Sequence, residues 1–272
     1  MEMSTDAKGL EWQVGVWDRI SELYLREVDR CFAPVVEGVI TRAALRPGER
    51  VLDLGTGTGA VAFRAAPLVD RPGRVTGVDI SSQMLSLAQR RATELGLKNV
   101  EFREGRAEAI PTEDVAFDVV LACLSLMYAI DRVTAAREIA RVLRPGGRLV
   151  AAVWGAPAEC DIVLFQQTAG SFAPPPPVPG VGPGALADPG TFLNSLSQAG
   201  IQAHVERQVL GFDFDDFESA WEVLAGVTTA QLPPERREEA KTAVRALMWP
   251  ADSPKHFTNM TQFIIASRLT KR

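Results

Sequence analysis

The stretch VLDLGTGTG at residues 51–59 decides the fold. Apolar residues around one acidic residue lead into three glycines at every second position, and a helix-forming run, residues 60–66, follows. This order predicts a strand, a tight turn and a helix. Glycine suits such a turn because it has no Cβ, so the backbone can bend sharply and approach a ligand closely. Glycine clusters also form ordinary loops, so a ligand site needs a second observation.

That second observation is an acidic residue at the end of the next predicted strand, residues 74–79. Asp79 lies 20 residues beyond Gly59, where the strand-ending carboxylate of a nucleotide-binding βαβ unit accepts hydrogen bonds from ribose hydroxyls. A simpler interpretation is that Asp79 only precedes Ser81 and Ser82, which can cap the next helix. This explains the residue but not its pairing with the glycine turn. Together the two features predict a nucleoside site.

The glycine spacing distinguishes between nucleoside cofactors. A dinucleotide site usually has its third glycine one residue later, so that the pyrophosphate meets the helix N-terminus. Here the pattern is G-x-G-x-G, with Asp53 two residues before the first glycine. A carboxylate there would repel a pyrophosphate and would suit an amino group, which disfavours a nicotinamide-dependent oxidoreductase.

The chain resembles the class I S-adenosylmethionine-dependent methyltransferases. Their first motif, D-x-G-x-G-x-G, is matched by Asp53, Gly55, Gly57 and Gly59. FDVV at residues 117–120 and ARVLRPGGRL at residues 140–149 are similar to later motifs of the branch that includes quinone C-methyltransferases and many bacterial small-molecule methyltransferases. The resemblance implies S-adenosyl-L-methionine as cofactor, S-adenosyl-L-homocysteine as product, and a last strand, residues 256–269, that runs antiparallel at the sheet edge.

Predicted strands and helices alternate from residue 46 to residue 154. Such alternation favours a parallel sheet with right-handed crossovers. The expected fold class is α/β: a doubly wound, mostly parallel seven-stranded sheet of the Rossmann-like type, with an antiparallel edge strand and a helical cap. We expect residues 1–272 to form one domain. Its core comprises about 46–155, 189–212 and 256–269, and its cap about 9–45, 156–188 and 213–255.

Composition excludes several classes of protein. The 272 residues are 46% hydrophobic and 23% charged, which is ordinary for a soluble globular protein, and the net charge of −5 argues against nucleic acid as a partner. The three cysteines form no C-x-x-C pair, which favours the cytoplasm and no structural metal. The longest apolar run, residues 119–130, is too short to span a bilayer. We expect a small-molecule substrate, with a homodimer as a candidate assembly.

Ligands of open α/β sheets bind outside the carboxyl ends of the strands. This rule and the resemblance together give the candidate cofactor-binding residues Tyr24, Asp53, Gly55, Thr56, Gly57, Gly59, Asp79, Ile80, Met84, Arg106, Ala107, Glu108, Cys123, Ser125 and Tyr128. For Cys123 a role as a small buried apolar residue is favoured over that of a nucleophile.

Arg106 departs from the pattern of the resembled family. That family commonly has an acidic residue followed by alanine after the third strand, and the acid takes the amino group of adenine. Arginine cannot accept a hydrogen bond, although its plane can lie against a base. The amide of Ala107 can still serve the ring, and Ile80 and Met84 can flank it.

Two residues are candidates for catalysis. His256 begins a strand that, if antiparallel, starts on the crevice side, so it is the better candidate for a general base than His204, which begins a parallel strand. Residues 17–24 resemble the segment that closes over the cofactor, and Tyr24 has a hydroxyl that needs a partner when buried. Alternatively, Trp17 and Tyr24 form the apolar stripe of a packed helix.

Methyl transfer from a sulfonium requires a nucleophile in line with the C–S bond, so positioning can supply most of the rate acceleration. The expected function is C-, O- or N-methylation of a small, partly apolar or aromatic molecule, in secondary metabolism of a bacterium. This rests on the cap aromatics Phe165, Phe172, Phe212, Phe214, Phe217, Trp221, Trp249 and Phe257. One alternative is cyclisation, pericyclic or decarboxylation chemistry on the same fold. Another is a non-catalytic binding domain, which only the polyproline segment 174–180 and the acidic-aromatic segment 212–217 suggest.

Overall fold

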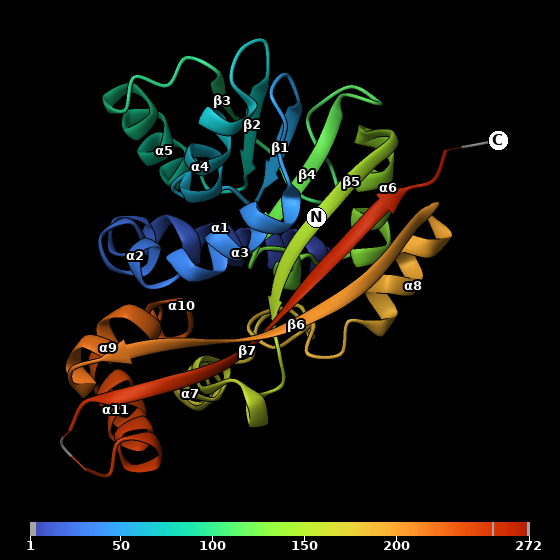
Figure 1. Ribbon diagram of the computed structural model, residues 1–272. Coiled ribbons are helices and arrows are strands. Elements are labelled where there is room, and N and C mark those ends of the chain that lie inside the picture. Colours follow the sequence, from blue (N-terminus) through green and yellow to red (C-terminus); the bar gives the residue numbers. More distant parts are fainter. Residues whose placement is uncertain (1–3, 252, 271–272) are drawn as a thin grey trace.

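A seven-stranded sheet forms the centre of the protein in the computed structural model, which describes residues 4–251 and 253–270 (Figure 1). The strand order is β3-β2-β1-β4-β5-β7-β6. The strands are β1 (Arg50–Leu54), β2 (Arg74–Asp79), β3 (Val100–Glu104), β4 (Phe117–Cys123), β5 (Leu143–Trp154), β6 (Ile201–Phe214) and β7 (Lys255–Arg268). Strands β1 to β5 pair in parallel, whereas β7 is antiparallel to β5 and β6. The predicted fold class is confirmed.

The antiparallel strand lies one position in from the sheet edge. β7 pairs with β5 on one side and with β6 on the other, so β6 is the outermost strand. β6 and β7 pair over 14 residues, beyond the last β5 pair, which joins Trp154 to Thr261. The hairpin therefore extends past the end of the parallel strands.

Helices cover both faces of the sheet. Before β1 the chain forms α1 (Thr5–Leu23), the π-helical turn η1 (Tyr24–Val28), α2 (Asp29–Cys31) and α3 (Ala33–Ala43). The helices between strands are α4 (Ala60–Val69), α5 (Ser82–Glu94), α6 (Arg132–Val142) and α8 (Gly190–Gln198). α3, α4 and α5 lie on one side of the sheet, and α6 and α8 on the other, as expected for doubly wound strands (Figure 1).

A second group of helices surrounds the extended part of the β6–β7 hairpin (Figure 1). It comprises α7 (Asp161–Gly170), α9 (Phe217–Leu224), α10 (Gly226–Thr229) and α11 (Pro234–Met248). Phe257 of β7 packs against Phe165, Phe214 and Trp249, with ring centroids 5.1 to 6.1 Å apart. These aromatic rings are buried and bind the helices to the hairpin.

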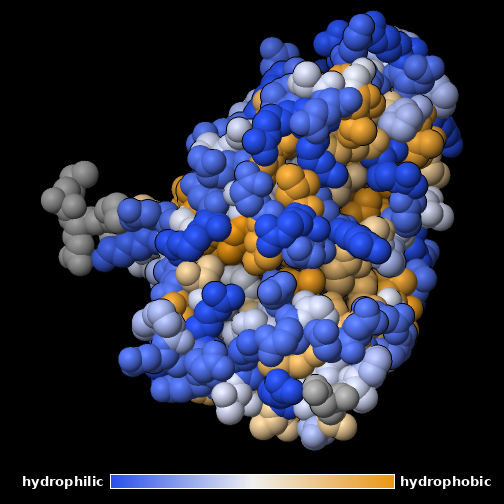
Figure 2. Space-filling model, turned by 90° about the vertical axis from the view of Figure 1, so that its left-hand side faces the viewer, coloured by the Kyte–Doolittle hydropathy of each residue, from blue (hydrophilic) through white to orange (hydrophobic). Residues whose placement is uncertain are grey.

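The surface on the side of α2 and α9 is mostly hydrophilic, with hydrophobic residues gathered in its middle (Figure 2). Within residues 4–251 and 253–270, no helix is long and apolar enough to cross a membrane. Over the same described residues, no three side chains of the usual metal-binding types form a cluster that could hold an ion.

Candidate cofactor pocket

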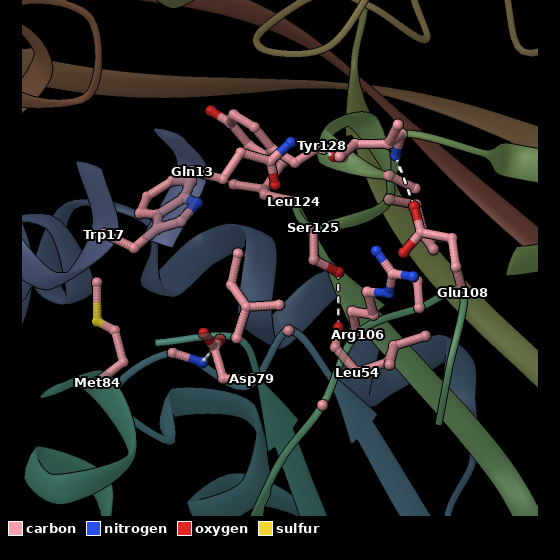
Figure 3. A pocket seen from close by; sticks show the side chains of 18 of the residues that line it. Gln13, Trp17, Leu54, Asp79, Met84, Arg106, Glu108, Leu124, Ser125 and Tyr128 are labelled. Carbon is pink, nitrogen blue, oxygen red and sulfur yellow. Dashed lines mark hydrogen bonds between the residues drawn. The ribbon is translucent and has the colours of Figure 1, made fainter. Parts of the chain in front are cut away.

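One pocket lies at the carboxyl ends of β1, β2, β3 and β4, and α1 and η1 form its opposite wall (Figure 3). Twelve of the candidate cofactor residues line it: Tyr24, Gly55, Gly57, Asp79, Ile80, Met84, Arg106, Ala107, Glu108, Cys123, Ser125 and Tyr128. Asp53, Thr56 and Gly59 do not line it. The structure thus brings together residues that are more than 100 positions apart in the chain.

The glycine turn and Asp79 are joined directly. The Gly57 N–H donates to Asp79 Oδ2 at 2.8 Å, and the Ser81 N–H donates to Asp79 Oδ1 at 3.0 Å. Gly57 has a φ of +53°, and a Cβ built there would point into open space. Burial raises the pKa of the Asp79 carboxyl, while the backbone N–H donors oppose that rise. The two loops therefore present a carboxylate and bare backbone to the pocket.

Asp53 lies beneath the turn and supports it. Its side chain is 1% exposed, and its Oδ2 accepts hydrogen bonds from the Thr56 hydroxyl at 2.6 Å and the Ala62 N–H at 3.0 Å. Burial raises the pKa of this carboxyl to about 7. Its Oδ1 is buried and has no hydrogen-bond partner among the described residues. Gly59 precedes α4, and the Phe63 ring occupies the space that a Cβ would need. These three candidates therefore lie behind the pocket wall.

Arg106 and Glu108 form the wall beyond β3. Glu108 Oε1 accepts hydrogen bonds from the Ile130 N–H at 2.6 Å and the Asp131 N–H at 3.1 Å, which fixes the carboxylate against the loop after β4. Arg106 is held by a short bridge between its backbone and that of Ala109. Figure 3 shows Arg106 and Glu108 on one side of the pocket, with Met84 and Trp17 on the other.

His256 lies outside the pocket lining. Its Nδ1 is 2.7 Å from Asp213 Oδ1, and its side chain is 59% exposed. The expected position at the crevice rim is wrong, because the start of β7 pairs with β6 past the end of β5 and carries His256 away from the pocket. His204 is also exposed, with its ring 3.9 Å from Glu206.

Comparison with known proteins characterises the region that carries this pocket. Residues 45–167 match the family model described as "Methyltransferase domain". This match covers less than half of the chain, and it is a similarity to methyltransferase domains. The matched residues include the glycine turn, Asp79 and all of the strands that end at the pocket.

Relatives of the chain agree with this similarity. The chain is 33% identical over 135 residues to the ubiquinone/menaquinone biosynthesis C-methyltransferase UbiE of Coxiella burnetii, which is 49% of this chain and 53% of that protein. It thus spans about half the length of the curated relatives it matches. In fold it is similar to the YcgJ protein of Bacillus subtilis, with a TM-score of 0.65, 23% identity and coverage of 87% and 99%. It is also similar to the [4+2]-cyclase SpnF, with a TM-score of 0.59, 25% identity and coverage of 88% and 81%.

The thiol and the two phenols that line the pocket are held protonated. Burial raises the pKa of the Cys123 thiol and of the Tyr24 and Tyr128 phenols above their usual values. These side chains can donate hydrogen bonds at neutral pH, but a thiolate or phenolate is disfavoured. The Ser125 hydroxyl is already committed, because it donates to the Leu54 carbonyl at 2.6 Å.

Part of the lining was not among the candidate residues. These residues are Leu10, Gln13, Trp17, Leu54, Gly105, Leu124, Leu126, Ala129 and Ile130. The Gln13 side chain donates from Nε2 to the Tyr128 carbonyl at 2.9 Å, and the Trp17 ring lies 5.0 Å from the Tyr128 ring. Leu10, Gln13 and Trp17 recur at helical spacing on α1, so that spacing could have identified them. It is equally typical of a packed helix, for which the polar Gln13 would be the one distinguishing sign.

Proposed function

We propose that this protein is an S-adenosylmethionine-dependent methyltransferase that acts on a small, partly apolar or aromatic molecule. The observation that carries the proposal is the joined glycine turn and Asp79 in a pocket of the region that is similar to methyltransferase domains. A carboxylate beside bare backbone suits a nucleoside, because it can accept hydrogen bonds from two ribose hydroxyls. We further propose a single cytoplasmic domain, with a homodimer as a candidate assembly.

The residues present fit this cofactor. Asp79 would hold the ribose, and the apolar side chains of Ile80 and Met84 would flank a flat base. The Asp53 carboxyl lies behind the glycine turn, where it accepts from the Thr56 hydroxyl and the Ala62 N–H, so it would hold the turn that meets the amino-acid end of the cofactor. When bound, S-adenosyl-L-methionine supplies an activated methyl group.

The remaining task of the chain is to position the two reactants and to exclude water. Trp17 and Tyr24 come from the N-terminal helical segment and Tyr128 from the turn η2 (Leu126–Tyr128), and all three line the pocket. Figure 3 shows Trp17 and Tyr128 across the pocket from Asp79. The Trp17 ring lies 6.2 Å from the Tyr24 ring and 5.0 Å from that of Tyr128, edge to face. Such an aromatic wall can hold an apolar acceptor against the methyl group, and the protonated phenols can donate hydrogen bonds to it.

These rings support an aromatic acceptor. So does the name of a curated relative, which is a ubiquinone/menaquinone biosynthesis C-methyltransferase. Most of the eight cap aromatics give no such support. Phe165, Phe217 and Phe257 are fully buried and pack against one another, so they form core. The secondary-metabolic setting rests on the sequence resemblance alone.

Calorimetry and a transfer assay test the proposal together. We expect one S-adenosyl-L-homocysteine molecule to bind per chain, and methyl-labelled S-adenosyl-L-methionine to label some phenol or hydroquinone in a panel of small aromatic molecules. Absence of calorimetric binding in the folded protein would end the cofactor assignment.

A non-methylating enzyme is the second candidate, and the likeness to a [4+2]-cyclase favours it. On the same fold, a bound adenosyl cofactor could shape a pocket for cyclisation, pericyclic or decarboxylation chemistry. The two functions differ in consumption of the cofactor. Release of one S-adenosyl-L-homocysteine per product supports transfer, whereas turnover without release supports the second candidate.

A further inference from the structure

The pocket wall beyond Asp79 offers hydrogen-bond donors rather than an acceptor. Arg106 lines the pocket, and its guanidinium has no hydrogen bond or ion pair with any residue in the described part of the chain. Ala107 also lines the pocket, and its backbone N–H has no hydrogen-bond partner among the described residues. Glu108, two residues after Arg106, is a carboxylate that lines the pocket, but its Oε1 already accepts two backbone N–H groups.

The order of the strands decides which part of the cofactor meets this wall. β3, β2 and β1 are adjacent in that order, and their ends carry Arg106, Asp79 and the glycine turn respectively. A ligand whose ribose lies at Asp79 and whose amino-acid end lies at the glycine turn must extend its base toward β3. Neighbouring strands are about 4.8 Å apart, so the end of β3 lies one strand spacing beyond Asp79, within reach of a base that extends from the ribose.

The edge of the base that reaches the wall is the one farthest from the ribose. In adenine this edge carries ring nitrogen N1, an acceptor, and the 6-amino group, a donor. A guanidinium offers up to five donors and no acceptor, so it can bond N1 but cannot take the amino group. A carboxylate at the same position would do the reverse.

We propose that Arg106 recognises the cofactor base by donating to acceptor atoms on this far edge, together with the Ala107 N–H. The inference rests on the proposed cofactor, and it makes Arg106 a specificity-determining residue. The pocket selects for acceptor atoms on the base and selects little for the 6-amino group. A base with a carbonyl at position 6 gains an acceptor for Arg106, while its N1 becomes a donor that faces Ala107, so the two changes offset each other.

Calorimetry with two ligands tests this inference. The probes are S-adenosyl-L-homocysteine and S-inosyl-L-homocysteine, in which a carbonyl replaces the 6-amino group, and the quantity measured is the ratio of their Kd values. For the unaltered protein we expect the two Kd values to lie within about threefold. Arg106→Asp should raise the ratio in favour of the adenosyl ligand by about tenfold or more, the range for a hydrogen bond to a charged group. Arg106→Leu should weaken both ligands by about tenfold.

Two further variants and a folding check complete the experiment. Arg137→Leu removes an exposed arginine on α6 that does not line the pocket, and it should leave both Kd values unchanged. Glu108→Gln tests whether the neighbouring carboxylate recognises the amino group instead. Thermal unfolding confirms that each variant is folded.

Two results would overturn the inference. One is an unchanged affinity in Arg106→Leu together with an unchanged ratio in Arg106→Asp, and the other is a base preference that depends on Glu108 rather than on Arg106. If the unaltered protein binds neither ligand, the proposed function itself is wrong, and the inference about Arg106 fails with it.

Discussion

Two regions beyond the carboxyl ends of the strands, the pocket and the extended β6–β7 hairpin, are held together by different interactions. At the ends of β1 to β4, short loops hold the pocket by hydrogen bonds between backbone and carboxylates, such as the 2.8 Å bond from Gly57 to Asp79. Around the extended β6–β7 hairpin, aromatic rings from segments far apart in sequence pack together, with Phe257 of β7 against Phe165 of α7. The first region should therefore determine binding, and the second should determine stability.

Gly57→Val should give the largest effect on binding. The residue has a φ of +53°, and its missing Cβ leaves open space toward the pocket. A β-branched side chain would occupy that space and strain the turn. We expect cofactor binding to fall by more than about a hundredfold in calorimetry, equivalent to about 3 kcal/mol.

Gly48→Val is the matched control. Gly48 has a φ of +87° and open space around it, but it lies in the exposed turn before β1. The Gly48→Val variant should lose about as much stability as Gly57→Val, but it should keep its affinity for the cofactor. Equal loss of binding in both variants would show that the turn acts through folding and not through the ligand.

Phe257→Ala tests the stability side. The ring is fully buried against Phe165, Phe214 and Trp249. Its truncation should lower the free energy of unfolding by about 3 to 5 kcal/mol in urea titrations. The folded variant should bind S-adenosyl-L-homocysteine with unchanged affinity. Leu247→Ala, at an exposed position on α11, should change the free energy of unfolding by about 0.5 kcal/mol or less.

Asp79→Asn should weaken the cofactor by about 1.5 to 3 kcal/mol, or tenfold to a hundredfold in Kd. The amide keeps the shape of the side chain but loses the charge and one acceptor, while Gly57 and Ser81 still need an acceptor. Isothermal titration of the folded variant measures the loss. An unaltered Kd would remove the ribose assignment.

Asp53→Asn should change the pH dependence of stability. Burial raises the pKa of the Asp53 carboxyl from an ordinary value of 3.8 to about 7. The folded state therefore binds this proton more tightly than the unfolded state, so its contribution to stability is complete below pH 3.8 and is lost as the pH rises through about 7. Thermal unfolding between these pH values should show that stability falls more steeply with rising pH in the unaltered protein than in the variant. Parallel curves would show that Asp53 is ionised throughout the range.

His256→Ala should have the smallest effect. The ring is exposed and pairs with Asp213 on the hairpin, outside the pocket lining. We expect unchanged kcat and unchanged cofactor affinity, because exposed ion pairs contribute about 1 kcal/mol or less to stability. A large fall in kcat would mean that the hairpin reaches the acceptor during turnover.

Local chemistry explains which parts of the structure could be predicted. The turn around Gly57 was predictable because its backbone conformation favours glycine. The position of Asp79 was predictable because it ends a strand that the sequence pattern identifies. The role of Asp53 differs, because the side-chain direction at the end of β1 decides whether it faces the ligand or supports the turn. Gln13 was missed, and Trp17 was left between pocket and core, because an apolar stripe on a helix is also typical of core packing. His256 was misplaced because its position depends on which strands pair beyond the sheet, a non-local property.

The most direct test of the account is a crystal structure with S-adenosyl-L-homocysteine. We expect the ligand in the pocket at the ends of β1 to β4, with its ribose hydroxyls donating to the Asp79 carboxylate and its homocysteine portion beside Gly57. Its base should lie between Ile80 and the wall formed by Arg106. A ligand bound elsewhere, or a ribose without contact to Asp79, would contradict the proposal.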